Sequence, residues 1–108
     1  MIILLTLWLS LWEYDGVYNV SAYCPCELCC GKKWSDGLTS TGGDAFSPGV
    51  AVDPSTILLG SILLIEGVGI READDVGGAI KGRKIDVRMK THREALIFGR
   101  KELYIWRK

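Results

Sequence analysis

The sequence contains a single histidine and no apolar run long enough to cross a bilayer. Its longest apolar run, residues 1–12, falls short of the about 20 residues that a membrane-spanning helix needs. That run also lacks the basic residues before it and the small residues after it that mark a complete signal peptide. We therefore interpret residues 1–15 as an apolar N-terminal segment. It is either the remainder of an export or membrane-anchor segment or an arm that packs on the domain.

Charge of one sign is not in excess either, since 13 Lys and Arg balance 13 Asp and Glu. The balance hides an asymmetry: residues 79–108 hold ten basic residues and three acids, whereas residues 1–78 hold three and ten. A basic region is one feature of nucleic-acid-binding proteins. Here the basic residues alternate with apolar ones, as in Arg83–Lys90, which is typical of strands with one solvated face. We therefore expect no binding to nucleic acid.

The length of 108 residues suffices for one domain, which we place at residues 16–108. Short β-branched runs separated by turn residues predict strands, and Thr91, Glu94 and Gly99 have the spacing of a helix cap, a capping box and a helix end. Many short strands with one short helix predict a mainly β fold, a small closed barrel. We expect strands at 17–23, 50–52, 61–65, 85–87 and 103–106, a long surface loop at 31–49, a turn at 66–69, a return segment at 70–73 and the helix over 91–99.

The most informative stretch runs from Asp75 to Val87 and holds two carboxylates, Asp75 and Asp86, with three glycines between them. Asp86 stands between two β-branched residues, so its side chain should point to the face opposite theirs. Gly77 and Gly78 should adopt backbone conformations that a side chain forbids and let a ligand approach closely. Such an aspartate is often only the solvent-facing member of a strand. A third carboxylate in similar company, Asp53, favours a functional site.

All four cysteines lie within seven residues. If the chain is exported, disulfides are their natural use. Cys26 and Cys29 have zinc-knuckle spacing, but a second, distant pair of ligands is missing, and free thiols are the remaining alternative. A catalytic cysteine is not favoured, because His92 is the only histidine. We expect structural cysteines and no metal, the cysteines being Cys24, Cys26, Cys29 and Cys30.

Several motifs occur together in order and resemble the 3D domain, a family named for three aspartates. It is found in stationary-phase survival and resuscitation-type cell-wall proteins and in the catalytic barrel of MltA-type lytic transglycosylases. The resemblance covers roughly Val20–Trp106. Its motifs are Val50–Pro54, Leu59–Ser61, Asp75–Gly82 and Ile85–Val87, with further matches at Tyr23, Thr39–Gly42 and Thr91–Ala95.

The resemblance implies a six-stranded double-psi β-barrel that cleaves the MurNAc–GlcNAc β-1,4 bond of peptidoglycan without water. It assigns the catalytic acid/base role to Asp86 and places Asp75 and Asp53 close by in the same groove. Asp75 would raise the pKa of Asp86 by like-charge repulsion. Two departures from the family pattern are Val76, where Thr is usual, and Arg88, where an aromatic or aliphatic residue is common.

Several residues are expected to bind the glycan, and each has a structural alternative. Thr39 and Thr41 would bond sugar hydroxyls or only form their loop, and Trp34 would stack on a sugar or anchor that loop. The basic residues Lys81, Arg83 and Lys84 would meet anionic parts of the polymer or form a solvated hairpin. His92 is interpreted as a helix-start residue. The expected substrate-binding residues are Thr39, Thr41, Gly77, Gly78 and Lys81.

Two other functions compete with the enzyme. One is a glycan-binding module on the same barrel without catalysis, and the other is a small metal-binding interaction domain built on the cysteine cluster. Retention of all three aspartates favours the enzyme. We expect a monomer without a cofactor that acts on peptidoglycan strands. It would be secreted, attached to the cell envelope through its N-terminal segment, or encoded by a phage.

Overall fold

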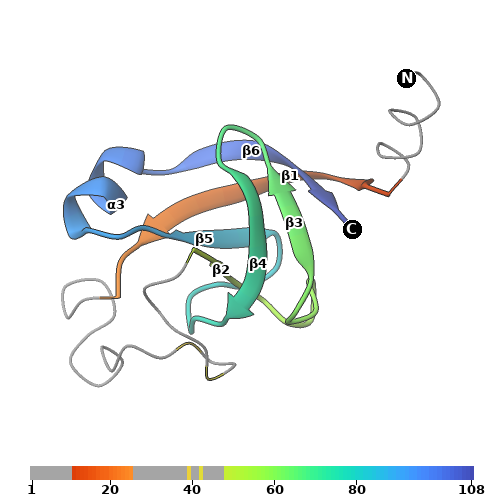
Figure 1. The fold of residues 1–108 in the computed structure, drawn as a ribbon, viewed down its shortest axis with the longest axis horizontal. Helices are drawn as coiled ribbons and strands as arrows, with labels where there is room; N and C mark the ends of the chain where they lie inside the picture. The colour runs from red at the N-terminus through yellow and green to blue at the C-terminus, as the bar shows by residue number, and fades with distance from the viewer. Residues whose placement is uncertain (1–10, 26–38, 40–41, 43–47) are drawn as a thin grey trace.

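The computed structural model describes residues 11–25, 39, 42 and 48–108. These residues form six strands and one short helix, drawn in Figure 1. The strands close into a barrel in the order β1-β5-β2-β4-β3-β6. The elements are β1 (Glu13–Tyr23), β2 (Val50–Val52), β3 (Ile62–Ile65), β4 (Gly69–Asp75), β5 (Lys84–Arg88), α3 (His92–Phe98) and β6 (Lys101–Arg107).

The barrel combines parallel and antiparallel strand pairs. Strands β1 and β5 run parallel, as do β2 and β4, whereas the other four neighbouring pairs are antiparallel. A parallel pair needs a crossover connection, so strands distant in the sequence become neighbours. The closed six-stranded double-psi barrel confirms the fold class predicted from the sequence. None of the helices in the described part of the chain has the length and apolar character needed to cross a membrane.

The predicted strands are all present, β2 with the expected bounds and the others with shifted ends. Strand β1 begins at Glu13, which pairs with Arg107, and Tyr14 pairs with Trp106, so the barrel pairing starts before residue 16. The return segment expected at 70–73 is a full strand, β4, that extends to Asp75. The turn at 66–69 is confirmed, because the Val68 N–H donates to the Ile65 carbonyl and Gly67 has a φ of 74°.

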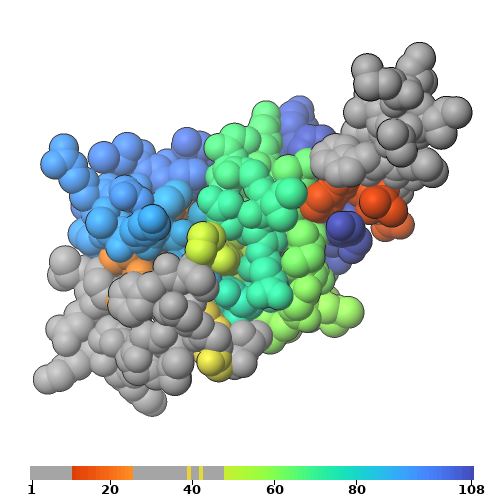
Figure 2. All heavy atoms as spheres, viewed as in Figure 1, coloured from red at the N-terminus to blue at the C-terminus, as the bar shows by residue number. Residues whose placement is uncertain are grey.

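Helix α3 confirms the capping prediction. The Thr91 side chain accepts a hydrogen bond from the Glu94 N–H at 3.1 Å, which satisfies one of the free donors at the helix start. Gly99 ends the helix with a φ of 67°, and its N–H donates to the Ala95 carbonyl. Only Ala95 is buried, while Leu96 and Ile97 are exposed. The space-filling view shows residues of α3 (light blue) and of β4 (blue-green) reaching the surface of the same face (Figure 2).

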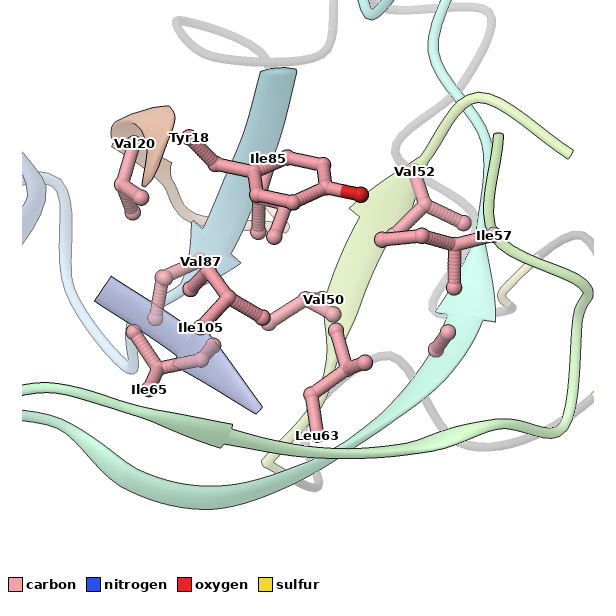
Figure 3. Packing of buried hydrophobic residues seen from close by; sticks show 11 residues of the cluster. Tyr18, Val20, Val50, Val52, Ile57, Leu63, Ile65, Ile85, Val87 and Ile105 are labelled. Atoms are coloured by element: carbon pink, nitrogen blue, oxygen red, sulfur yellow. The ribbon is translucent and has the colours of Figure 1, made fainter. Parts of the chain in front are cut away.

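The barrel interior is filled by aliphatic side chains from every strand and by Tyr18 (Figure 3). In β5 the alternation is clear, since Ile85 and Val87 are fully buried and Asp86 between them faces the other side of the strand. Each buried aliphatic side chain contributes about 1.5–3 kcal/mol through the hydrophobic effect. Packing on both sides of Asp86 therefore fixes the position from which its carboxylate projects.

Candidate active site

Asp86 of β5 and Asp75 of β4 lie on the same face of the barrel, on either side of strand β2. In the strand register, Asp86 lies opposite Ser21 of β1 on one side and Ala51 of β2 on the other. Ala51 in turn lies opposite Asp75 of β4. Residues that pair across strands project to the same face, so Ser21, Asp86, Ala51 and Asp75 form one row. Two strand spacings separate the two aspartates, roughly 10 Å between their backbones.

A bulge in β4 adds a second acid to this face. Val50 pairs with Ala73, and the next residue of β2, Ala51, pairs with Asp75, so Asp74 is an extra residue. An extra residue interrupts the alternation of side chains and re-aims those beside it. Ala73 accordingly stays in the core while Asp74 reaches Arg88 of β5. The adjacent acids Asp74 and Asp75 therefore both serve the face that carries Asp86.

Asp86 is half-buried and has one side-chain hydrogen bond to a described residue, from the Ser21 hydroxyl to Oδ1 at 3.0 Å. Burial raises its pKa above the ordinary value, the Ser21 bond and the Arg100 charge act against this, and the Asp75 charge adds to it. The raised pKa agrees with the prediction. Its main cause differs, because loss of hydration outweighs the repulsion from Asp75 on which the prediction relied.

Asp75 has a more fixed environment than Asp86. The Tyr23 hydroxyl donates to Oδ2 at 2.8 Å, and the Val76 N–H donates to Oδ1 at 3.0 Å. Arg88 Nη1 donates in turn to the Tyr23 hydroxyl oxygen at 3.1 Å. Burial raises the pKa of Tyr23, so this hydroxyl keeps its proton and acts as a donor to Asp75.

Arg88, a departure from the family pattern, is buried and paired. Its Nη1 and Nη2 donate to the two oxygens of Asp74 at 3.0 and 2.6 Å, a bidentate pair. The guanidinium leaves no room at Gly49, where an added Cβ would lie 2.3 Å from Nη2. Burial lowers the pKa of Arg88, and the bonds to Asp74 and Tyr23 reverse this and raise it. Asp74 was not predicted from the sequence, although two adjacent acids in one strand and a basic residue in another were a detectable sign of an ion pair.

Asp53 has a different environment from Asp86 and Asp75. Its Oδ1 accepts hydrogen bonds from the backbone N–H and the hydroxyl of Ser55, at 3.0 and 2.7 Å. Its Oδ2 accepts from the Gly82 N–H at 2.8 Å. These donors, chiefly the Gly82 N–H, lower the pKa of Asp53 to about 2, and the Lys81 charge adds to the effect. Asp53 thus ties the turn after β2 to the turn that leads into β5, and it does not line the pocket that Asp86 faces.

A pocket of about 580 Å³ opens beside Asp86. One wall comes from the turn before β5 and another from α3 and the residues after it. Asp86 is the only carboxylate among the described residues that line it. These residues are Asn19, Ser21, Ala22, Tyr23, Ala79, Ile80, Lys84, Asp86, Ala95, Leu96, Gly99 and Arg100.

A sequence model of the 3D domain matches residues 49–107. The chain belongs to the 3D domain family. The segments that match it contain Asp53, Asp75 and Asp86, the three acids on which the resemblance was based. Of these, the structure places Asp86 and Asp75 in one row of the barrel and puts Asp53 in a neighbouring turn.

Two curated relatives, both from Bacillus subtilis (strain 168), are similar to this 3D domain. The chain is 44% identical over 73 residues to the cell wall-binding protein YocH, covering 64% of the chain and 25% of YocH. It is 46% identical over 56 residues to the putative cell wall shaping protein YabE, covering 52% of the chain and 14% of YabE. The chain therefore spans a quarter or less of these relatives.

A solved structure, that of MltA from E. coli, has a similar fold. The TM-score is 0.54 at 25% sequence identity, and the match covers 65% of this chain and 26% of MltA. The likeness extends to about a quarter of MltA, so it concerns one region of that protein.

None of the predicted substrate-binding residues Thr39, Gly77, Gly78 and Lys81 lines the pocket beside Asp86. Lys81 is exposed and does not line the pocket. Neither Gly77 nor Gly78 has a positive φ, contrary to expectation, and the left-handed residue of this turn is Gly82, with a φ of 64°. Gly77 instead lies close to Ile80, whose Cγ1 would be 3.0 Å from an added Cβ. Thr39 is buried, whereas Thr41 and Trp34 lie outside the described residues.

Among the three basic residues before and at the start of β5, only Lys84 lines the pocket. Arg83 turns away, donating from Nε to the Val17 carbonyl at 3.0 Å and from Nη2 to the Asp15 carbonyl, with its guanidinium 4.1 Å from the Tyr18 ring centroid. The second basic residue among the described residues of the pocket is Arg100, which follows α3 and was not predicted from the sequence.

Of the four cysteines, the structure describes Cys24, while Cys26, Cys29 and Cys30 lie outside the described residues. Cys24 is buried, and its Sγ lies 3.8 Å from Nδ1 of His92. His92 is the first residue of α3, as predicted, so this contact joins the helix start to the end of β1. In the described part of the chain, no group of three or more potential ligand side chains is arranged to hold a metal ion.

Proposed function

We propose that this 3D domain is a peptidoglycan lytic transglycosylase of the cell envelope, with Asp86 as its general acid and base. The observation that carries the proposal is the environment of Asp86, a half-buried carboxyl with a raised pKa that faces an open pocket. A carboxyl with a raised pKa can hold a proton closer to neutral pH and deliver it to a leaving group.

The reaction would proceed in two proton transfers at one carboxyl group. Asp86 first donates its proton to the glycosidic oxygen as the bond between that oxygen and C1 of MurNAc breaks. The C6 hydroxyl oxygen of the same MurNAc then bonds to C1, and its proton passes to the Asp86 carboxylate. The products are a 1,6-anhydroMurNAc end and a free 4-hydroxyl on GlcNAc, and Asp86 recovers its proton.

The site suits a reaction with a single principal acid. A hydrolytic glycosidase needs a second carboxylate to activate water or to attack the sugar. Here the nucleophile belongs to the substrate, so proximity supplies much of the barrier reduction. Asp75, fixed in the same row by Tyr23 and the Val76 N–H, does not line the pocket, so its charge would stabilise positive charge that develops at C1 from a longer distance.

Asp53 would contribute through structure. Its bond to Gly82 holds the turn that leads into β5, and β5 carries Asp86. A site of this kind needs its reactive group held within a fraction of an ångström by surrounding elements. We therefore assign Asp53 a positioning role and expect its replacement to slow the reaction without abolishing it.

Product analysis in water labelled with ¹⁸O tests the proposal. Purified protein is incubated with peptidoglycan, and the released fragments are measured by mass spectrometry. A transglycosylase gives 1,6-anhydro ends without ¹⁸O, and these should be absent with Asp86→Asn. Reducing ends that carry ¹⁸O would instead show a hydrolase and overturn the proposed reaction.

A glycan-binding module without catalysis is the second candidate, and the name of the relative YocH, a cell wall-binding protein, favours it. On this view the pocket would hold a glycan and Asp86 would accept hydrogen bonds from its hydroxyls. Retention on insoluble peptidoglycan without any released fragment would support it. The raised pKa of Asp86 favours the enzyme, since binding of hydroxyl groups does not require a proton on the carboxyl.

A further inference from the structure

The pocket contains two basic residues that the proposed reaction does not use. Lys84 lies two residues before Asp86 on β5, so both side chains project to the same face of the strand, roughly 7 Å apart along it. Arg100 lines the same pocket from the end of the connection between α3 and β6. The two cations therefore approach Asp86 from different elements.

These two cations differ from three arginines of the barrel strands and the turn before β5, which form ion pairs. Arg83 and Arg107 both pair with Asp15, and Arg88 pairs with Asp74. Within the described part of the chain, neither Lys84 nor Arg100 forms an ion pair. Among the described residues that line it, the pocket thus has two cations and a single carboxyl, Asp86, whose pKa is raised.

The remaining lining residues indicate what an anionic ligand would look like. Ala79 and Ile80 on one side, and Ala95 and Leu96 on the other, give the pocket apolar walls. Such walls suit the apolar face of a sugar ring or an acetamide methyl group. A ligand that fits would combine an N-acetylated sugar with a carboxylate, because an arginine and a lysine together bind carboxylates well.

We propose that Lys84 and Arg100 form an anion subsite that binds a carboxylate of the glycan or of its attached peptide. This inference rests on the proposed function and adds a basis for selectivity. The subsite would favour strands that contain muramic acid over neutral β-1,4-linked N-acetylglucosamine polymers. The carboxylate has two potential sources, the lactyl group of peptide-free strands and the acidic residues of the stem peptide.

Binding measurements separate the subsite from the chemistry. Isothermal titration at pH 7 uses three soluble ligands of equal length: peptide-free peptidoglycan strands, strands with intact peptides, and chitin oligosaccharides. All proteins carry Asp86→Asn so that no ligand is cleaved. The variants are Lys84→Gln, Arg100→Gln and the double variant, and Arg93→Gln is the matched control because Arg93 is exposed on α3 and does not line the pocket.

The parent protein should bind at least one carboxylate-containing strand about tenfold more tightly than chitin, as expected for two charge-assisted contacts. The double variant should lose this preference while its affinity for chitin stays unchanged, and Arg93→Gln should behave as the parent does. Tight binding of peptide-free strands identifies the lactyl carboxylate, whereas a preference confined to intact strands identifies the peptide.

Three results would overturn the subsite. The double variant could keep the preference, the parent protein could bind chitin as tightly as both kinds of strand, or the parent protein could bind none of the ligands. The outcome is independent of cleavage. If the charge-dependent preference is found but no anhydro product is formed, the subsite stands and the transglycosylase proposal fails. Raising the salt concentration should weaken the preference, because ions screen charges at partly exposed sites.

Discussion

Strand β2 lies between β4 and β5, and the carboxylates on these two strands have different environments. On the β5 side, Asp86 accepts one side-chain hydrogen bond, from Ser21, and faces an open pocket. On the β4 side, Asp74 and Asp75 are held by Arg88, Tyr23 and a backbone N–H. The β4 side therefore holds its carboxylates in fixed positions, whereas the β5 side leaves one carboxyl facing a pocket, as the proposed proton transfers require. The same division suggests variants that should affect one side and spare the other.

The largest expected effect is on the β4 side. Removing one partner of a buried ion pair leaves the other charge uncompensated, which typically costs about 3–5 kcal/mol. We expect Arg88→Met to lower the free energy of unfolding by this amount in a urea titration. The double variant Arg88→Met, Asp74→Leu should recover much of the loss. Arg93→Met, at an exposed position on α3, is the control and should change stability little. A single Arg88 variant as stable as the parent would contradict the role of the pair.

A smaller loss of stability is expected from removing the Tyr23 hydroxyl, which links Arg88 to Asp75. Tyr23→Phe removes the hydroxyl that accepts from Arg88 and donates to Asp75, and should cost about 1–2 kcal/mol. Product formation should also slow, because Asp75 is less well positioned. Tyr104→Phe is the matched control, since Tyr104 is 48% exposed on β6. Equal effects of the two variants would show that the Tyr23 hydroxyl has no special role.

Asp86 and Asp53 should affect stability in opposite directions at pH 7. The pKa of Asp86 is raised in the folded protein, so its ionisation opposes folding above the ordinary value of about 3.9. Asp86→Asn should therefore raise Tm at pH 7 and leave it unchanged near pH 3. The pKa of Asp53 is lowered to about 2, so its ionisation favours folding above about 3.9, and this contribution is lost as the pH falls toward 2.

Asp53→Asn should accordingly lower Tm slightly at pH 7, and its difference from the parent should shrink as the pH falls through this range. Thermal unfolding followed by circular dichroism between pH 2 and 7 measures both variants. Shifts of the same sign at pH 7 would contradict the assigned environments of the two carboxylates.

The smallest effect is expected from removing the Ser21 hydroxyl, which donates a hydrogen bond to Asp86. Ser21 stabilises the charged form of Asp86, so Ser21→Ala should raise the pKa of Asp86 further. Carbon-detected NMR titration of the Asp86 carboxyl reports this directly. Ser61→Ala, at a partly exposed position before β3, should leave it unchanged. A pKa that stays constant or falls in Ser21→Ala would show that the hydroxyl does not donate to the carboxylate.

Local sequence patterns predicted the helix and every strand except β4, which was expected only as a return segment. Alternation around Asp86 predicted which way its side chain points, and the Thr91 cap predicted where α3 begins. Features that depend on how the strands pair could not be predicted from such local patterns. The β4 bulge at Asp74, its pairing with Arg88 and the approach of Arg100 to Asp86 all join residues from different strands or connections. The different environments of Asp53 and Asp86 could not be predicted either, because both residues stand beside β-branched residues in the sequence.

The central claim is that Asp86 alone performs the proton transfers, and a matched pair of variants tests it most directly. The rate of 1,6-anhydro product formation is measured by mass spectrometry for the parent, Asp86→Asn and Asp53→Asn at one pH. We predict no anhydro product above background with Asp86→Asn, and product formation within about tenfold of the parent with Asp53→Asn, as expected for a positioning residue. Product formation by Asp86→Asn at the parent's rate would contradict the account.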